Sequence, residues 1–189
     1  MSERILVLDP GERVGWCHAE VLAAILSPER DPDEPAYMSV TGHGITPLKD
    51  MALALAKNIG KYDTVIYETW RLYAHKAKYL IGGDMQSSQF IGMVRLLAWL
   101  NPSVKLVSQG ANCMTTGDKV ATPAIREILN NLPKSHDESH DGSALRHLSY
   151  YYFQKYVGLT RDTQQSNRAP SSDPGAPHGH SVQASAVPA

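Results

Sequence analysis

The chain has 189 residues, a formal net charge of −1 and a hydrophobic content of 42%. This size and composition indicate one domain with a substantial core, and the near-zero charge excludes a uniformly basic nucleic-acid coat protein. The two cysteines, Cys17 and Cys113, provide neither a disulfide framework nor a zinc-binding CxxC pattern.

The charges are unevenly distributed along the chain. Residues 1–70 contain six Lys and Arg against eleven Asp and Glu, whereas residues 71–155 contain ten against six. This asymmetry allows a basic face on a near-neutral protein. The charged N-terminal residues do not read as a signal peptide, and no segment reaches the roughly 18 apolar residues of a membrane span. We therefore expect a cytoplasmic protein with reduced cysteines.

The N-terminal half predicts an antiparallel meander followed by a helix and a strand. The expected strands are Arg4–Asp9, Val14–Leu22 and Tyr37–Gly44. Thr46 and Pro47 read as an N-cap and the first position of a helix that ends at Gly60. The short apolar segment "DTVIYE" then predicts a strand that ends at Glu68.

The C-terminal half alternates helices with one further strand. After a long connection, residues 84–100 have helical periodicity and residues 104–107 read as a strand. We expect an irregular loop over 108–121, a helix capped by Thr122 and Pro123, and a last helix over 137–156. The residues after 158 are rich in Pro, Ser and Ala, which predicts a domain over 1–158 and a disordered tail over 159–189.

Acidic residues occupy the ends of predicted elements. Asp9 ends the first strand, Glu68 ends the fourth, and Asp141 lies in the first turns of the last helix, preceded by Asp137 and Glu138. If the first and fourth strands are neighbours, Asp9 and Glu68 lie side by side, and a helix across that edge adds Asp141. Clustered carboxylates repel one another unless a cation lies between them. Oxygen ligands of this kind favour Mg²⁺ or Mn²⁺, and two such ions can support phosphodiester hydrolysis.

Simpler interpretations of these acids remain open at this point. Asp9 precedes Pro-Gly and is compatible with an ordinary turn residue. Asp137 and Glu138 are compatible with acids at a helix N-terminus, where the helix dipole favours negative charge.

The ordered set of motifs resembles the RuvC family of Holliday-junction resolvases. "LVLDPGERVGW" is similar to the first family motif, "VIYE" to the second, and "DESHDGSALRHL" to the closing helix. The Q-x-x-G pattern at Gln89–Gly92 and the "TTGDKV" loop are also similar. The resemblance covers roughly residues 4–156, and the divergence, length and tail resemble a bacteriophage version, which would act in the host cytoplasm.

The resemblance implies a fold and an activity. The fold would be α/β and ribonuclease H-like, with a five-stranded mixed sheet flanked by helices, in agreement with the predicted order of elements. The activity would be that of a Mg²⁺-dependent (or Mn²⁺-dependent) crossover junction endodeoxyribonuclease in DNA recombination and repair. A homodimer would place paired nicks across a four-way DNA junction.

The resemblance also implies roles for individual residues. Asp9, Glu68 and Asp141 would bind metal, with Glu138 as the fourth acid and Asp137 as its alternative. Lys119 would contact the scissile phosphate or stabilise the charge of the transition state. His140 is either an assisting residue or a solvated helix histidine.

The connection after Glu68 carries aromatic residues between basic ones. This mixture suits stacking on the unpaired bases of a junction, although a core position for the tryptophan is an equal alternative. The candidate DNA-binding residues are Trp70, Arg71, Tyr73, Lys76 and Lys78.

The helix predicted over residues 84–100 is more apolar than one core face requires. We interpret the excess as a dimer face, the alternative being a fully buried core helix. The residues concerned are Met85, Phe90, Met93, Leu97 and Trp99.

Other functions compatible with these residues are cleavage of forks or flaps by a phage nuclease, ribonuclease H-type RNA cleavage, and junction binding without catalysis. An actin-like ATPase is disfavoured because the chain is short and lacks a second phosphate-binding loop.

Overall fold

A computed structural model describes residues 2–22, 37–69, 85–133 and 140–157 of the chain. Five strands form one mixed sheet in the order β3-β2-β1-β4-β5. β1 (Ser2–Asp9), β2 (Arg13–Leu22) and β3 (Met38–Pro47) are antiparallel neighbours. β4 (Thr64–Glu68) and β5 (Lys105–Gln109) continue the sheet parallel to β1.

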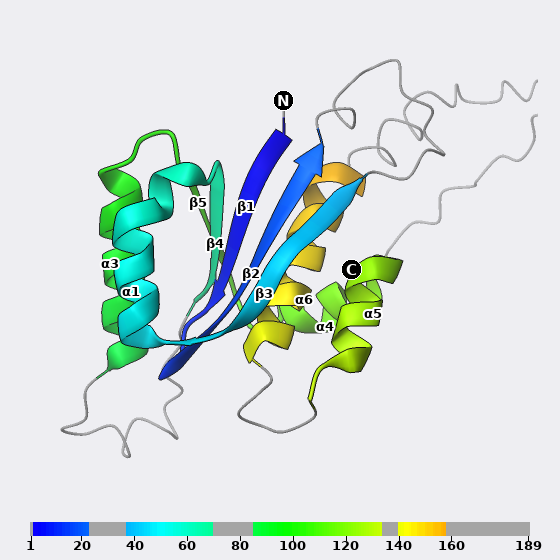
Figure 1. The fold of residues 1–189 in the computed structure, drawn as a ribbon. Coiled ribbons are helices and arrows are strands. Elements are labelled where there is room, and N and C mark those ends of the chain that lie inside the picture. The colour runs from blue at the N-terminus through cyan, green and yellow to red at the C-terminus, as the bar shows by residue number, and fades with distance from the viewer. Residues whose placement is uncertain (1, 23–36, 70–84, 134–139, 158–189) are drawn as a thin grey trace, which may run out of the picture.

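The sheet separates two layers of helices, as Figure 1 shows. α1 (Leu48–Asn58) and α3 (Gln86–Trp99) lie against one side. α4 (Cys113–Lys119), α5 (Pro123–Asn131) and α6 (His140–Tyr152) lie on the other. A 3₁₀ turn over Ile59–Lys61 follows α1, and a π-helical turn over Phe153–Val157 follows α6.

Alternation along β1 divides the core into two clusters. Ile5 and Val7 pack with residues of α5 and α6, whereas Leu6 and Leu8 pack with residues of α1 and α3. Successive side chains of a strand point to opposite faces, so Asp9 belongs to the face that α6 covers. The expected α/β fold with a five-stranded mixed sheet is confirmed.

Two local predictions were wrong. Pro47, not Thr46, precedes α1, and the Thr46 hydroxyl instead accepts a hydrogen bond from the Trp16 indole at 2.8 Å. Thr46 thus remains in β3, because tertiary pairing outweighs the local cap signal. By contrast, Thr122 caps α5 as expected, accepting a hydrogen bond from the Ile125 amide.

The second wrong prediction is the irregular loop over 108–121, of which residues 113–119 form α4. This helix is stabilised by tertiary packing against α6, because Gly117 lies directly against the backbone of Arg146. A Cβ atom at Gly117 would come within 2.0 Å of the Arg146 carbonyl oxygen. Asp118 also forms an ion pair with Arg146.

One carboxylate near the start of β1 binds residues of β4, of α6 and of the π-helical turn that follows α6. Glu3 accepts hydrogen bonds from the hydroxyls of Thr64, Tyr151 and Tyr156 and from the ammonium group of Lys155. These contacts hold the helix along the sheet from its C-terminal end.

Several predictions fall on residues outside the described ranges. They are the DNA-binding residues Trp70, Arg71, Tyr73, Lys76 and Lys78, the acids Asp137 and Glu138, and the tail over 159–189. Within the described ranges, no helix has both the length and the apolar character needed to cross a membrane.

Candidate functional site

Three adjacent parallel strands end in polar residues at the same edge of the sheet. Asp9 is the last residue of β1, Glu68 of β4 and Gln109 of β5. Leu8 is paired with Tyr67, so Asp9 and Glu68 follow neighbouring residues, and Glu68 is itself paired with Gln109. The residues two positions earlier, Val7, Ile66 and Val107, belong to the core on the α6 face, so all three side chains lie on that face. Ligand sites of open α/β sheets commonly lie at the carboxyl ends of the strands.

The N-terminus of α6 lies across this edge, at the lower end of the sheet in Figure 1. Gly15, the residue paired with Asp9, makes the close approach possible. A Cβ atom at Gly15 would come within 2.1 Å of the carbonyl group of His140 and 2.7 Å of the Asp141 amide nitrogen. Only glycine leaves room for the helix backbone here, and the helix brings Asp141 to the edge where Asp9 ends.

Asp9 is held by a histidine from the first residue of α6. Its Oδ2 atom lies 2.7 Å from His140 Nδ1, and the Asp9 residue is only 8% exposed. The imidazole also lies close to Gly11 of the turn after β1. His140 was one of two open interpretations in the sequence, and the structure shows it in contact with a predicted metal ligand rather than merely solvated.

Asp141 is held by a histidine from β3. Its Oδ2 atom lies 3.1 Å from His43 Nδ1, and its Oδ1 atom accepts a hydrogen bond from the Gly142 amide. Asp141 is buried, whereas His43 is partly accessible.

Burial, and secondly the negative charge of Asp141, raise the pKa of the Cys17 thiol beneath the helix. Cys17 is therefore a core residue and not a nucleophile.

Glu68 is held by a third histidine, and this one is completely buried. His147 Nε2 lies 2.9 Å from Glu68 Oε2, while its Nδ1 atom lies 2.7 Å from Gln109 Oε1. His147 has no exposed surface, and Gln109 is also buried. One imidazole thus joins the ends of β4 and β5 to α6.

The structure therefore brings Asp9, Glu68 and Asp141 to one edge of the sheet, as the sequence predicts. Lys119 is exposed at the end of α4, a helix packed against α6. His43, His147 and Gln109 were not predicted from the sequence. The available signal for His147 was a lone histidine on the apolar face of the last helix, and for Gln109 a polar residue at a strand end.

The donor chemistry of the edge fits a divalent cation. Three carboxylates supply the hard oxygen ligands that Mg²⁺ and Mn²⁺ prefer, and the partly accessible His43 and His140 lie beside two of them. In the described part of the chain, however, no group of three or more His, Cys, Asp and Glu residues is close enough to enclose an ion. Each carboxylate is paired with a histidine instead.

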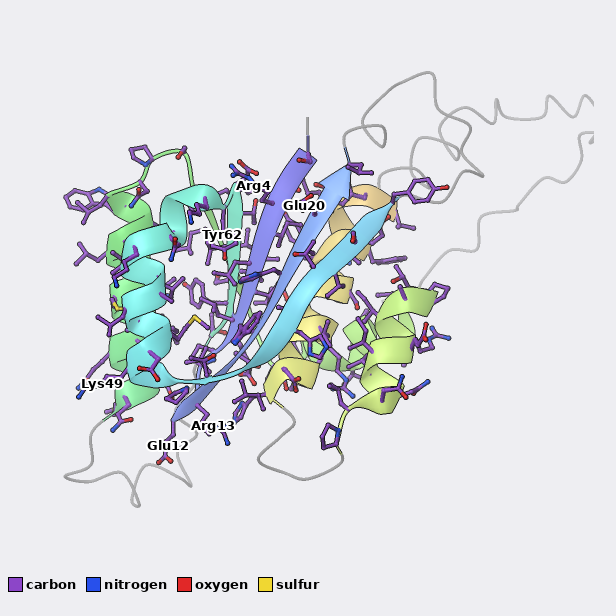
Figure 2. All side chains as sticks on the ribbon, viewed as in Figure 1. Arg4, Glu12, Arg13, Glu20, Lys49 and Tyr62 are labelled. Atoms are coloured by element: carbon purple, nitrogen blue, oxygen red, sulfur yellow. The ribbon has the colours of Figure 1, made fainter. Side chains whose placement is uncertain are left out.

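The fold belongs to the ribonuclease H-like class. Its features are the strand order β3-β2-β1-β4-β5, with three antiparallel strands followed by two parallel ones, and helices on both faces. Figure 2 shows that Glu12 of the turn after β1, Arg13 at the start of β2 and Lys49 of α1 lie at the lower end of the sheet.

Two solved structures share this fold with the chain. The first is T. thermophilus RuvC in complex with a Holliday junction substrate, with a TM-score of 0.53 and 15% identity over 84% of this chain and 97% of RuvC. The second is the yeast mitochondrial Holliday junction resolvase Ydc2, with a TM-score of 0.53 and 11% identity over 85% of this chain and 84% of Ydc2. No protein-family model matches the chain, and no curated protein matches it.

Proposed function

We propose that this protein is a structure-selective, metal-dependent DNA endonuclease that resolves Holliday junctions. The observation that carries the proposal is the meeting of Asp9, Glu68 and the α6 N-terminus with Asp141 at one edge of the sheet. The fold of this chain is similar to that of RuvC, which was solved with a Holliday junction substrate, and to that of Ydc2, a Holliday junction resolvase. RuvC is matched over nearly its whole length.

Asp9, Glu68 and Asp141 would hold Mg²⁺ or Mn²⁺, with Glu138 as the fourth acid and Asp137 as its alternative. The bound metal would supply activation of a water molecule and neutralisation of charge on the phosphodiester. The carboxylates lie on strand ends and on a helix anchored at Gly15, which are rigid elements. Rigid placement matters because hydrolysis of this kind depends on positioning the reacting groups.

Lys119 is our candidate for contact with the scissile phosphate. It is exposed on a helix that packs against α6, the helix that carries Asp141. A lysine in this position would stabilise negative charge on the phosphate in the transition state. Trp70, Arg71, Tyr73, Lys76 and Lys78 would bind the junction through stacking and phosphate contacts.

Two-fold symmetry of a junction requires two sites, and α3 offers a surface for a homodimer. Of the residues expected on this surface, Phe90 is a core residue, and Met93 and Leu97 pack partly against the core. Met85 and Trp99 are exposed, and Leu96 and Leu100 add to the exposed apolar surface. A second copy of the chain would cover this surface and relate two sites by symmetry.

The test compares four substrates: a four-way junction, a fork, a linear duplex and an RNA–DNA hybrid, each with Mg²⁺, with Mn²⁺ and with a chelator. We expect metal-dependent, paired nicks in the junction. Asp9→Asn should abolish cleavage and retain junction binding, because it removes a metal ligand and leaves the basic residues in place. Asp50→Asn, at an exposed acid in the first turn of α1, is the matched control and should cleave normally.

Each other result identifies a different function. Cleavage of forks alone, or of hybrids alone, would retain the nuclease and change its substrate. Junction binding without cleavage in any metal would indicate a binding protein. Normal cleavage by Asp9→Asn would contradict the assignment of the site.

A further inference from the structure

Among the described residues, His147 is the most completely buried polar residue that the proposed mechanism leaves unused. It has no exposed surface, and it lies in α6 among the core residues Ala144, Leu145 and Leu148. An imidazole in such a position needs partners for both ring nitrogens, because an unsatisfied buried polar group is costly. Both partners are present, and both come from the strand ends that form the candidate site.

The two contacts impose a direction on the hydrogen bonds. An ionised Glu68 only accepts hydrogen bonds, so His147 Nε2 must carry a proton and donate it. In a neutral imidazole, Nδ1 then accepts, and it faces the side-chain amide of Gln109. A glutamine amide can turn either its NH₂ group or its oxygen toward this atom. With its NH₂ group toward Nδ1, Gln109 donates to that atom and holds the ring in place, while Nε2 donates to Glu68.

The arrangement differs from the two other histidine–carboxylate pairs. The side chains of His43 and His140 are about one third exposed, at 31% and 35%, whereas that of His147 is inaccessible. A cation or a substrate can therefore reach His43 and His140, but His147 can act only through Glu68. The Glu68 carboxylate is 19% exposed, so one side of it faces solvent while His147 holds it from the core.

We propose that His147, oriented by Gln109, is a positioning residue that fixes the Glu68 carboxylate for metal binding. The inference rests on the proposed function, since it assigns a role to a neighbour of the proposed ligand. Buried hydrogen bonds of this kind fix the orientation of a ligating carboxylate before the ion arrives. Thr69 helps to hold Gln109 in place, because its amide and its hydroxyl both donate to the Gln109 backbone carbonyl oxygen.

Two isosteric substitutions separate positioning from simple packing. In His147→Gln, the side-chain amide nitrogen can occupy the place of Nε2 and still donate to Glu68. In His147→Asn, the shorter amide can replace only Nδ1, so the contact with Gln109 is retained and the one with Glu68 is lost. Both variants place an amide in the core, which makes their cost in stability comparable.

The primary measurement is Mn²⁺ binding to the full-length protein without DNA, followed by calorimetry or by electron paramagnetic resonance of free Mn²⁺. We expect His147→Asn to weaken Mn²⁺ binding by about 10- to 100-fold, the usual effect of losing such a partner. His147→Gln should bind Mn²⁺ nearly as the wild type does. In junction cleavage at a fixed, subsaturating metal concentration, the Asn variant should lower kcat and leave KM unchanged, because His147 does not touch DNA.

A third variant covers the case in which His147→Asn fails to fold. Gln109→Met removes the partner of Nδ1 with little change in volume, and it too should weaken Mn²⁺ binding. Equal Mn²⁺ affinity of the Gln and Asn variants, or wild-type affinity in Gln109→Met, would overturn the positioning role. A wild-type protein that neither binds Mn²⁺ nor cleaves branched DNA would instead overturn the proposed function, and this inference with it.

Discussion

Replacing Gly15 by alanine tests the contact that brings Asp141 to Asp9. The new Cβ atom would lie 2.1 Å from both the carbonyl carbon and oxygen of His140 and 2.7 Å from the Asp141 amide nitrogen. Carbon atoms in contact are normally about 3.5–4.0 Å apart. All three neighbours are backbone atoms, so no side-chain rotation can relieve the overlap. The N-terminus of α6 must therefore move away from β2 by more than about 1 Å.

Two quantities follow from this displacement. Overpacking of a well-packed core costs about 1–3 kcal/mol, and for a protein of this size each kcal/mol lowers Tm by about 2–4 °C. We therefore expect Gly15→Ala to lower Tm by roughly 4–8 °C for a cost of about 2 kcal/mol. A misplacement of about 1 Å between catalytic groups can also reduce activity by about 100-fold, so junction cleavage should fall more than stability.

Thermal unfolding and junction cleavage below the Tm of the variant would measure the two effects. Gly42→Ala is the matched control, because its Cβ would meet only the Trp16 ring at 3.5 Å or beyond, which is ordinary contact. Its Tm and its activity should stay close to those of the wild type. A Gly15→Ala protein with unchanged Tm and activity would refute the seating of α6 on β2 from which the site is built.

Three further predictions concern other parts of the molecule. Burial lowers the pKa of His18, so the unfolded chain takes up a proton first and stability falls as the pH drops below about 6.5. His18→Gln should therefore lose less unfolding free energy than the wild type between about pH 7.5 and about pH 5.5, and equal losses in urea titrations would contradict this. Glu3→Ala should cost about 1–3 kcal/mol in the same assay, because the buried Thr64 hydroxyl loses its acceptor. The effect should exceed that of Glu20→Ala at an exposed position of β2. Trp99, which is 77% exposed, should lie in the dimer interface, so Trp99→Glu should sediment as a monomer where the wild type sediments as a dimer. A wild-type chain that is monomeric at every concentration would end the dimer proposal.

Local pattern was sufficient for much of the fold. The apolar runs before Asp9 and Glu68 predicted strands that end in acids, and the Thr122–Pro123 pair predicted a helix start with its cap. Strand alternation also places Asp9 and Glu68 on one face once the strands are neighbours. These features depend on backbone preferences within a few residues, which is the range over which sequence patterns act.

Contacts between distant segments were beyond the reach of pattern. Thr46 bonds to Trp16 rather than to its own helix, and residues 113–119 are helical where they meet α6 at Gly117. The sequence predicted the three acids without the histidines that contact them. It could not show that His147 joins Glu68 to Gln109. That contact depends on the rotation and height of α6 over the sheet, which the packing at Gly15 and Gly117 determines to within an ångström or so. The sequence determined which carboxylates reach the edge of the sheet, and the tertiary structure alone decided which side chains hold them there.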